Sequence, residues 1–525
     1  MASTVRPGDL AEELEAVRAR AAGVAEELGA AASASRTLGR ERAILRLIGV
    51  GGIDREGRPL AAEVVDRYVS GHPDRLSAGA ALPFAMALLE YDVGPQQLAL
   101  DVAGGTVDLA MEAEVLARPD RRAAAEDLLD RLVAAALDRI DANRTARREL
   151  LGVLGDTPPP WIGTTLVEAS ADGATGEATE LVRAGADVLR VEVPVGRELA
   201  MRLGELGQEV LAWRPSRDDD PDPAPSGSQR GLARLRDGLD RAAAERGAYV
   251  RLAMVPAALA SPEGAIVAAF ERADVLELDP MAEIVGTGVD PERALADFAF
   301  AVRVARRAGT AIQLGAGPLV VAPDLDAGVN SDPATRAGRA LALQLLAVAL
   351  ARRDGLDDGA VIVGALPGWL VDEPDAAARA AAEVALRRAL LAGHPLAFIE
   401  PGGQDASGRW LAIMAGVVPG EGAGLVLRRP VPGPAFGPVA SGTRAIADVA
   451  RELEASLGPR QLTGIALDHA AGCLASALRT FDRLTGEGWS ALTGSGPGRG
   501  GWGRLGGDAV APAGDRRDPV DRALG

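Results

Sequence analysis

The spacing of apolar residues at the start of the chain predicts an amphipathic helix. Such spacing, in alternating steps of four and three, places side chains on one face of a helix. Residues 40–150 continue with helical patterns separated by glycine turns, including a helix rich in alanine and arginine from Arg121 to Leu151. We therefore predict a helical N-terminal accessory region over residues 1–156. The apolar positions of its first helix are Leu10, Leu14, Val17, Ala21, Val24 and Leu28.

The pattern changes at the run Thr157-Pro158-Pro159-Pro160, because prolines cannot continue a helix. Short apolar or β-branched runs then alternate with helical stretches such as EATELVRAGA. Strands that alternate with helices form parallel βαβ units, and eight strands close a (β/α)8 barrel. We predict such a barrel over residues 157–430. Its eight candidate strands start at Trp161, Asp187, Glu209, Ala248, Asp274, Thr310, Ala360 and Leu396.

A doubly wound open sheet is the alternative fold. It would need a glycine-rich phosphate-binding turn after an early strand. The segment WIGTTLVEASADG from Trp161 does not provide one. The acidic, proline-rich insert at residues 217–229 follows the third predicted strand and would lie at the mouth of a barrel. Its composition is typical of a mobile loop, and we expect a solvated spacer rather than a lid.

Two helical patterns follow the eighth predicted strand and the run GLVLRR. The first has Ile446, Val449 and Leu453 on one face, and the second runs from Leu462 to Leu484. We assign residues 431–490 to C-terminal helices. Residues 491–525 begin with a stretch too rich in glycine for a core, and we predict a flexible Gly/Pro-rich tail.

Composition narrows the class of protein. The 525 residues are 48% hydrophobic and 25% charged, which is ordinary for a globular chain. A formal net charge of −18 and only 3% aromatic residues argue against nucleic-acid binding. We recognise no apolar run long enough for a bilayer, and charged residues stand where a signal peptide would be apolar. We expect a cytoplasmic protein without a membrane partner.

Cysteine, histidine and lysine usage limits the chemistry. The single Cys473 lies in a helical pattern, and we expect a buried, unreactive thiol. We find no second histidine or cysteine at ligand spacing from His72, His394 or His469, so we expect no metal site. The chain contains no lysine. It therefore cannot form a Schiff base with pyridoxal phosphate (PLP) or supply a P-loop lysine.

Polar residues at the carboxyl ends of the predicted strands are the candidate site, since ligands of such barrels bind there. Asp279 and Glu400 close apolar strands and are the candidates for general acid/base catalysis. The competing interpretation is that they cap helices or pair with arginine. The glycines of LGAGP, Gly315 and Gly317, could admit a phosphate, although a plain turn is the simpler interpretation. The other candidates at the mouth are Glu192, Arg197, Arg214, Glu277 and Gln313.

The segment ERAILRLIGVGGIDREGRPLAAEVVDRYV from Glu41, followed by GPQQLALDVAGGTVDL, resembles the N-terminal region of the α subunit of D-lysine 5,6-aminomutase. The resemblance recurs at LVRAGADVLRVEVPVG, at RGAYVRLAMVP and at RTFDRLTGEGWSAL. It implies a (β/α)8 barrel that holds PLP at its mouth and faces a smaller β subunit carrying adenosylcobalamin. The implied reaction is a radical 1,2-shift of an amino group. In the family the Schiff-base lysine comes from the β subunit, so a lysine-free chain is compatible with it.

Several positions depart from what the resemblance implies. The scaffold features Gly196, Arg251 and Gly315 persist, but phosphate ligands, a ring-stacking tyrosine and the acid that holds the substrate amine are replaced. The replaced positions are Val193, Glu198, Ala257, Ala282, Thr287 and Gly317.

Two hypotheses follow from these departures. In the first, the chain is an aminomutase-like enzyme subunit that works with a cobalamin-binding β subunit, in a heterodimer that could oligomerise further. In the second, it is a non-catalytic barrel that binds and regulates such an enzyme.

Overall fold

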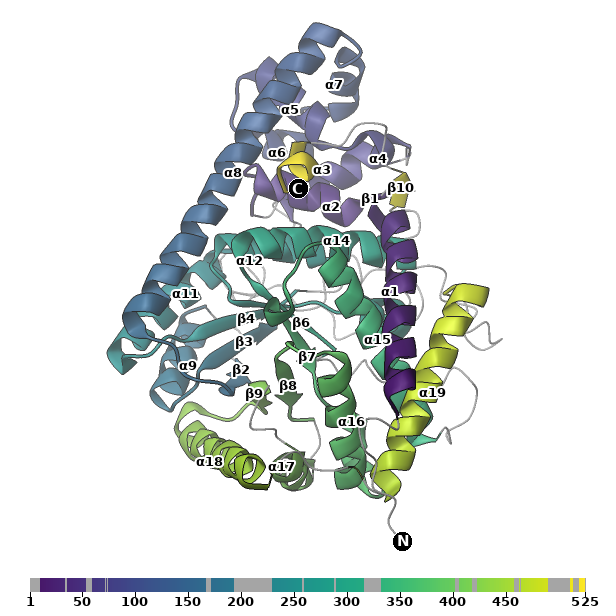
Figure 1. Cartoon of the computed structure of the whole chain (residues 1–525). Helices are drawn as coiled ribbons and strands as arrows, with labels where there is room; N and C mark the ends of the chain where they lie inside the picture. The colour runs from purple at the N-terminus through teal and green to yellow at the C-terminus, as the bar shows by residue number, and fades with distance from the viewer. Residues whose placement is uncertain are drawn as a thin grey trace, which may run out of the picture.

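The computed structural model describes residues 10–33, 35–52, 59–70, 72, 74–166, 171–192, 229–256, 259–287, 289–315, 332–401, 406–417, 423–457, 462, 464–489, 510–512 and 519–524. Its centre is a closed barrel of parallel strands (Figure 1). The predicted fold class is therefore confirmed. The strands are β2 (Trp161–Thr165), β3 (Val188–Glu192), β4 (Arg251–Val255), β5 (Val275–Glu277), β6 (Ala311–Leu314), β7 (Val361–Gly364), β8 (Leu396–Ile399) and β9 (Ala423–Arg428).

One strand of the prediction is reassigned. The candidate strand at Glu209 lies outside the described residues. GLVLRR, which we placed after the eighth strand, forms β9 and is the closing strand. It pairs in parallel with β8 on one side and with β2 on the other, where Gly163 lies opposite Leu427. Its apolar, β-branched composition resembles that of the other strands, so the sequence signal was present.

Helices surround the barrel and cover its outer face. Short helices flank two of the strands: α13 (Pro280–Ala282) and the π-helix η2 (Glu283–Thr287) follow β5, and the 3-10 helices η4 (Asp358–Ala360) and η5 (Gly368–Asp372) precede and follow β7. The long ones are α9 (Ala171–Arg183), α11 (Gln229–Arg246), α12 (Ser261–Phe270), α14 (Pro291–Ala308), α15 (Pro333–Arg353), α16 (Ala376–Leu390), α17 (Ala406–Val417) and α18 (Gly433–Leu457).

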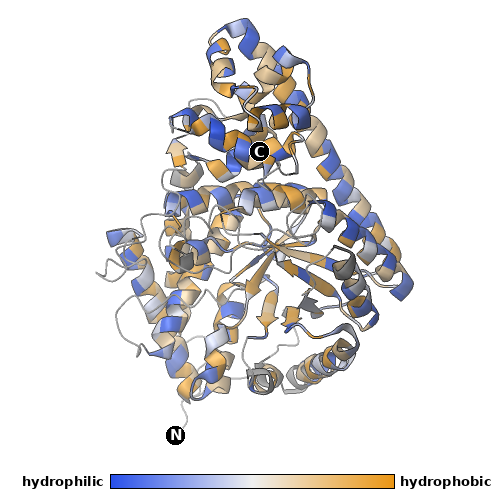
Figure 2. Cartoon of the chain, turned by 180° about the vertical axis from the view of Figure 1, so that it is seen from behind, coloured by the Kyte–Doolittle hydropathy of each residue, from blue (hydrophilic) through white to orange (hydrophobic). Residues whose placement is uncertain are grey.

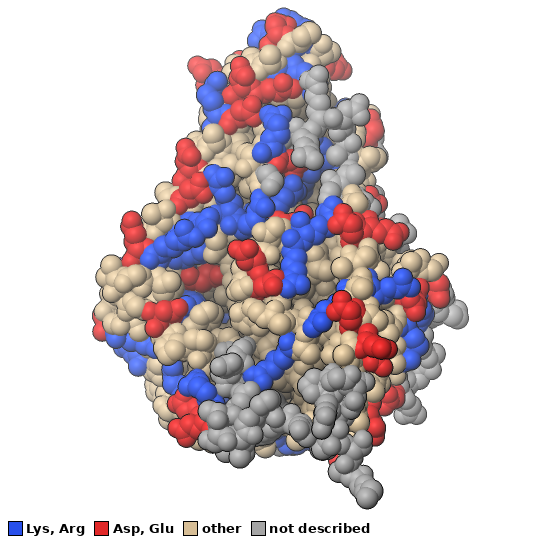
Figure 3. Space-filling model, viewed as in Figure 1, with Lys and Arg blue, Asp and Glu red and all other residues tan. Residues whose placement is uncertain are grey.

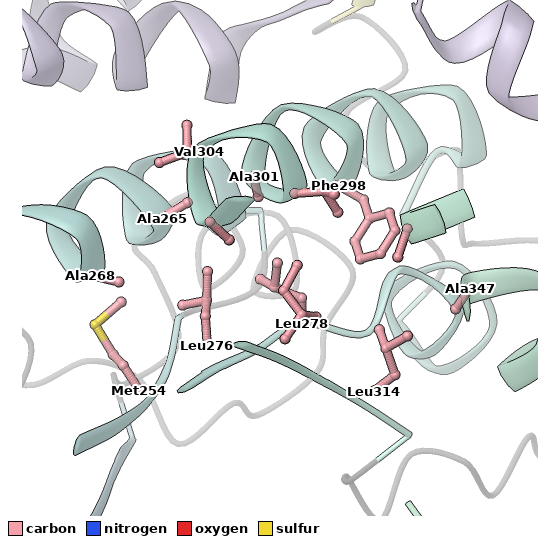
Figure 4. Packing of buried hydrophobic residues seen from close by; sticks show 14 of the residues in the cluster. Met254, Ala265, Ala268, Leu276, Leu278, Phe298, Ala301, Val304, Leu314 and Ala347 are labelled. Atoms are coloured by element: carbon pink, nitrogen blue, oxygen red, sulfur yellow. The ribbon is translucent and has the colours of Figure 1, made fainter. Parts of the chain in front are cut away.

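Strand alternation separates two cores. Side chains at one parity, such as Val188, Ala253 and Val275, fill the barrel interior. Side chains at the other parity point outward into the helices, as Figure 4 shows for Met254 and Leu276 beneath α12 and α14. Apolar residues accordingly concentrate on the strands and on the inner faces of the helices (Figure 2). The barrel interior is a packed core. Polar residues that lie an even number of positions from an interior apolar residue on the same strand also point into the barrel.

The N-terminal helices form a cap beside the barrel (Figure 1). The first helix confirms the predicted face, because Val17, Ala21 and Val24 are buried and α1 packs on α15 and α19. The elements are α1 (Ala11–Ser33), β1 (Ser35–Thr37), α2 (Leu38–Leu47), α3 (Leu60–Val69), α4 (Arg75–Ala78), α5 (Ala81–Tyr91), α6 (Pro95–Ala103), α7 (Leu109–Val115) and α8 (Pro119–Leu154).

Helix α8 is anchored to the barrel through the ends of other helices. Arg147 donates hydrogen bonds to the carbonyls of Ala308 and Gly309 at the C-terminal end of α14. Asn143 donates to the carbonyl of Phe270, the last residue of α12, at 2.8 Å. These carbonyls have no partner within their own helix, and the negative end of each helix dipole favours a cation. On the face seen in Figure 3, arginine and carboxylate side chains are interspersed.

The C-terminal part departs from the prediction in two ways. Helix α18 turns Val449 outward, with 55% of its surface exposed, and buries Phe436, Ala440 and Ala447 instead. The predicted flexible tail contains two ordered elements, β10 (Val510–Pro512) and α21 (Pro519–Leu524). Strand β10 pairs antiparallel with β1, and Val520 is fully buried. This contact of the last residues with the first helices is not visible in local composition.

The second C-terminal helix, α19 (Gly464–Glu487), packs on α15 and α16. Helix α15 has the length and apolarity of a membrane span, which we did not expect from the sequence, but 78% of that window is buried inside the protein. Its apolar character is that of a helix covered by neighbours on several sides.

Residue Asp521 of α21 allows a test of how the C-terminus is held. Its carboxylate accepts hydrogen bonds from Arg40 of α2 and, at 3.1 Å, from Arg303 of α14. The Arg40 side chain is only 4% exposed. We expect Asp521→Asn to lower the free energy of unfolding by about 2 kcal/mol, because Arg40 loses a charged partner while buried. Thermal and chemical unfolding measure the change.

The matched control is Asp130→Asn, which removes the ion pair between Asp130 of α8 and Arg522 of α21. Arg522 and Asp130 are each about half exposed, so we expect a loss of about 0.5 kcal/mol or less. Equal losses in the two variants would show that the buried pair does not hold α21 in place.

Candidate functional site

The interior of the barrel carries a polar layer near the carboxyl ends of the strands, formed by Thr165, Arg190, Glu277 and Gln313. Arg190 donates to both carboxylate oxygens of Glu277, from Nε at 2.9 Å and from Nη2 at 3.2 Å. Its Nη1 donates to Thr165 Oγ1 at 3.2 Å, and Gln313 Nε2 donates to Glu277 Oε2 at 3.4 Å. We call these four residues the interior polar layer.

Strand topology explains why this layer lies inside the barrel. Arg190 is on β3 and Glu277 on β5, with β4 between them. Each follows an interior residue by two positions, Val188 and Val275, so all four share the inward parity. The Arg190 and Glu277 side chains are only 14% and 10% exposed. A two-pronged pair of this kind neutralises both charges where water is scarce.

Asp279 lies just beyond β5 and serves the backbone. Its carboxylate accepts from the amide of Ala282 at 3.1 Å, which caps α13, and from the amide of Gly315 at 3.1 Å. Burial raises the pKa of Asp279 to about 6, although these backbone hydrogen bonds act in the opposite direction. The carboxyl therefore titrates near neutrality and could exchange a proton there. Its geometry agrees with the capping interpretation.

Glu283 begins the π-helix η2 next to Asp279. Burial is the main cause that raises the pKa of Glu283 to about 7, and the negative charge of Asp297 adds to it. Ser261 Oγ donates to its carboxylate at 3.2 Å. Sequence reasoning did not single out Glu283, because only the fold brings it beside Asp279 and Asp297. Short π-helical turns often occur at functional sites.

Gly315 occupies a turn that only a small residue can support. Its φ is +67°, and a Cβ on Gly364 of the neighbouring strand would lie 2.2 Å from the Gly315 carbonyl oxygen. The Gly315 amide, which could have served a phosphate, points instead to Asp279. This arrangement corresponds to the plain turn of the sequence interpretation.

Glu400 lies apart from these residues. Its carboxylate accepts from Arg428 Nε at 2.9 Å and from the amide of Arg429 at 3.0 Å. Arg428 also donates to Thr443 of α18 and lies over the ring of Trp410 of α17. Glu400 therefore belongs to the packing between the barrel and its outer helices, and it follows the arginine-pairing interpretation.

The remaining candidates are only partly placed. The backbone of Glu192 pairs with Val255 at the end of β3. Ala282 lies in α13 and Thr287 ends η2. Arg190 was missed at the sequence level, although the alternation in VLRVE places a charge at an interior position of a buried strand. The positions outside the described residues are Val193, Gly196, Arg197, Glu198, Arg214, residues 217–228 of the acidic insert, Ala257 and Gly317; the last residue of the insert, Gln229, begins α11.

A second buried polar cluster joins α16 to α19. His469 Nε2 lies 2.9 Å and Cys473 Sγ 3.2 Å from Glu383 Oε1, and Arg387 pairs with the other oxygen. The potential ligand atoms of Glu383, His469 and Cys473 lie within 4.8 Å of one another. His469 and Cys473 are four residues apart on one helix face, so our finding of no cysteine at ligand spacing was wrong.

Arginine already satisfies this cluster. Arg379 Nη1 lies 3.2 Å from His469 Nδ1, and because arginine can only donate, Nδ1 accepts and Nε2 carries the proton given to Glu383. Burial alone would raise the pKa of Glu383, but Arg387 and His469 outweigh it and lower the pKa to about 2. Burial raises the pKa of the Cys473 thiol, which is fully inaccessible. The thiol is buried as expected, and it acts as a hydrogen-bond donor.

The cluster continues to the barrel. Arg387 Nε donates to Gln344 Oε1 and to the carbonyl of Gly364, both at 2.9 Å. Gln344 Nε2 donates to the same carbonyl at 2.9 Å. Buried hydrogen bonds therefore run from the end of β7 through α15 and α16 to His469 of α19.

The residues of the interior polar layer do not fit the phosphate of PLP. A phosphate dianion needs free cationic or amide donors. Arg190 is engaged by Glu277 and Thr165, and the Gly315 amide is engaged by Asp279. The nearby acids Glu277, Asp279 and Glu283 would repel a dianion. We therefore derive no chemical step through PLP.

The raised pKa of Glu283 predicts a pH dependence of stability. The pKa is about 7 in the folded chain against an ordinary value of 4.5, so this group favours the folded state at low pH and loses that effect as the pH rises through 7. We expect Glu283→Gln to melt above the wild type at pH 8 but not at pH 5. Thermal unfolding at both pH values measures this, with exposed Glu149→Gln as the control. A difference independent of pH would contradict it.

The Glu383 cluster predicts the opposite dependence. The lowered pKa of Glu383 stabilises the fold above pH 4.5, and this effect is lost as the pH falls through 2. We expect Glu383→Gln to cost about 3 to 5 kcal/mol at neutral pH, because Arg387 stays buried without a carboxylate. Unfolding by urea between pH 3 and 7 measures both effects.

The control for this variant is Glu373→Gln, which removes a partly exposed pair with Arg336. It is expected to change stability little. If Glu383→Gln were as stable as this control, the buried cluster would not support the packing of α19.

Comparison with known proteins places the chain in a family. A family model described as the D-lysine 5,6-aminomutase TIM-barrel domain of the alpha subunit matches residues 10–408. The lysine 5,6-aminomutase alpha subunit of Acetoanaerobium sticklandii is 26% identical over 303 residues, covering 58% of this chain and 55% of that protein. The alpha subunit of Fusobacterium nucleatum is 28% identical over 284 residues, covering 54% and 51%.

These matches span about half the length of the curated relatives. Among solved structures, a phospho-2-dehydro-3-deoxyheptonate aldolase from Thermotoga maritima overlaps 57% of this chain and 70% of its own at 13% identity, with a TM-score of 0.33 that is too low to bear on function. The family model covers most of the barrel and the whole helical cap. The chain therefore belongs to the family of lysine 5,6-aminomutase alpha-subunit barrels.

Proposed function

We propose that this chain is the α-like subunit of a cytoplasmic, cobalamin-dependent aminomutase assembly, and that it binds a smaller β subunit which carries adenosylcobalamin. The observation that carries this proposal is the match of residues 10–408 to the alpha-subunit barrel, together with the closed barrel itself. The proposed reaction of the assembly is a 1,2-shift of an amino group on an amino acid. The substrate is not specified by the described residues.

The two cofactors enter this proposal differently. Adenosylcobalamin would supply radical chemistry from the partner subunit, and PLP would have to be held by groups other than the interior polar layer. The chain has no lysine, so any Schiff base must come from another subunit. The polar residues described here have structural roles. Asp279 stabilises the turn at Gly315, and the interior polar layer fills the barrel below its mouth.

A second function is supported by the structural hydrogen bonds and ion pairs that the candidate acids already form. Asp279 caps a helix, Glu277 pairs with Arg190, and Glu400 pairs with Arg428. Groups committed in this way are poorly placed to serve a substrate. This supports a non-catalytic α-like barrel that binds the cobalamin subunit, or an intact aminomutase, and regulates or repairs it.

Co-expression tests the proposal and separates the two functions. The chain is expressed with the product of a neighbouring gene that has a cobalamin-ligating DxHxxG motif. We expect a stoichiometric complex that retains cobalamin through purification. Failure to form a complex with such a subunit, or with an intact aminomutase, would remove both functions.

The same complex distinguishes catalysis from scaffolding. Absorbance of bound PLP together with transfer of an amino group on lysine or ornithine would establish the enzyme. A complex that forms without PLP after reconstitution, and that restores activity to an inactivated aminomutase, would establish the scaffold. Glu373→Gln, a surface change on the same chain, serves as the control for general effects of substitution.

A further inference from the structure

We infer that Glu277 fills, from within the chain, the place that an anionic ligand would take at Arg190, and so closes the interior polar layer to phosphate groups, including that of PLP. The inference concerns the ligand of the barrel and does not depend on whether a β subunit binds. It begins from the disagreement between the cofactor that the family implies and the residues at the mouth.

The first observation is the geometry of the pair. The planar guanidinium of Arg190 presents Nε and Nη2 to the two oxygens of Glu277, at 2.9 and 3.2 Å. This is the arrangement in which arginine binds a free carboxylate or a phosphate. The carboxylate of Glu277 therefore stands where two oxygens of an anion would stand.

The second observation is that the rest of the interior polar layer completes this arrangement. Thr165 takes the third nitrogen of Arg190, and Gln313 donates to the carboxylate from the neighbouring strand β6. The carboxylate receives donors from two strands, from Arg190 on β3 and from Gln313 on β6. Among the described residues, a ligand at Nε and Nη2 of Arg190 would have to displace Glu277 from these partners.

The third observation is the sign of the surrounding charge. Asp279 follows Glu277 by two residues, and Glu283 follows Asp279 by four. Burial is the main cause that raises the pKa of Asp279 and of Glu283; the charge of Glu277 adds to it at Asp279, and the charge of Asp279 adds to it at Glu283. An incoming anion would add to that repulsion, whereas removing the charge of Glu277 would relieve it and open Nε and Nη2 of Arg190 to a ligand at the same time.

The experiment is a binding titration on the full chain and three variants. Inorganic phosphate and PLP are titrated separately by calorimetry into the wild type, Glu277→Gln, the double variant Arg190→Met/Glu277→Gln, and Glu400→Gln. The last is the matched control, because it breaks a similar arginine–glutamate pair on the outward side of β9.

We expect no saturable binding of either anion to the wild type or to Glu400→Gln. Glu277→Gln is expected to gain saturable phosphate binding. Its association constant should be at least about tenfold higher than any association constant measured for the wild type. The double variant is expected to lose that gain, since Arg190 supplies it. Weak binding shared by all four proteins at high concentration would count against the inference, because it would not depend on Glu277.

Three results would overturn the inference. They are saturable phosphate or PLP binding by the wild type, a folded Glu277→Gln that binds no better than the wild type, and a double variant that keeps the gain. If Glu277→Gln does not fold, Glu277→Ala is used, and its melting temperature is measured with and without acetate. Acetate should raise that temperature by refilling the carboxylate position, and no rise would also overturn the inference.

Discussion

The burial of arginine beside carboxylates is the constraint on which the structure depends. The chain has no lysine, and Arg236, Arg293 and Arg387 are almost fully buried. Each pairs with an acid one turn away on its own helix and also reaches the backbone of another element. The five donors of a guanidinium allow this double use, whereas a lysine ammonium is a single point of charge. Their further acceptors are the carbonyls of Val250, Leu259 and Gly364.

The same constraint applies inside the barrel. At one end Arg251 lies 3.5 Å from the ring centre of Trp161 and donates to Asp156, and at the other Arg190 pairs with Glu277. Removing one partner of such a pair would leave the other charge buried without compensation, which is strongly destabilising. In the part of the mouth that the structure describes, the charge of Arg190 is already balanced by Glu277. Burial is the main cause of the raised pKa values of Asp279 and Glu283, and the neighbouring acids add to it.

The fold could be predicted from the sequence because its signals are local. Apolar runs of strand length alternate with amphipathic helices, and the proline run at residues 157–160 separates two patterns. Seven of the eight predicted strands are barrel strands, and the eighth position belongs to β9. The strand at Glu209 competed with GLVLRR because both are apolar runs of similar length. Choosing between them requires knowing which run pairs with both β8 and β2, and pairing is not a local property.

The site and the C-terminus could be predicted only in part, for the same reason. The sequence placed Asp279, Gln313 and Glu400 at strand ends, since alternation and turn residues fix those positions. Only tertiary structure decided that Glu277 faces Arg190, that His469 and Cys473 meet Glu383, and that α21 docks near α2. The sequence by itself determined the alternation of strands and helices, which predicts the eight-stranded barrel. It also determined the absence of lysine, which excludes a Schiff base formed by this chain. The partners of its charges were set by the fold, because an ion pair joins residues whose distance in space has no relation to their spacing along the chain.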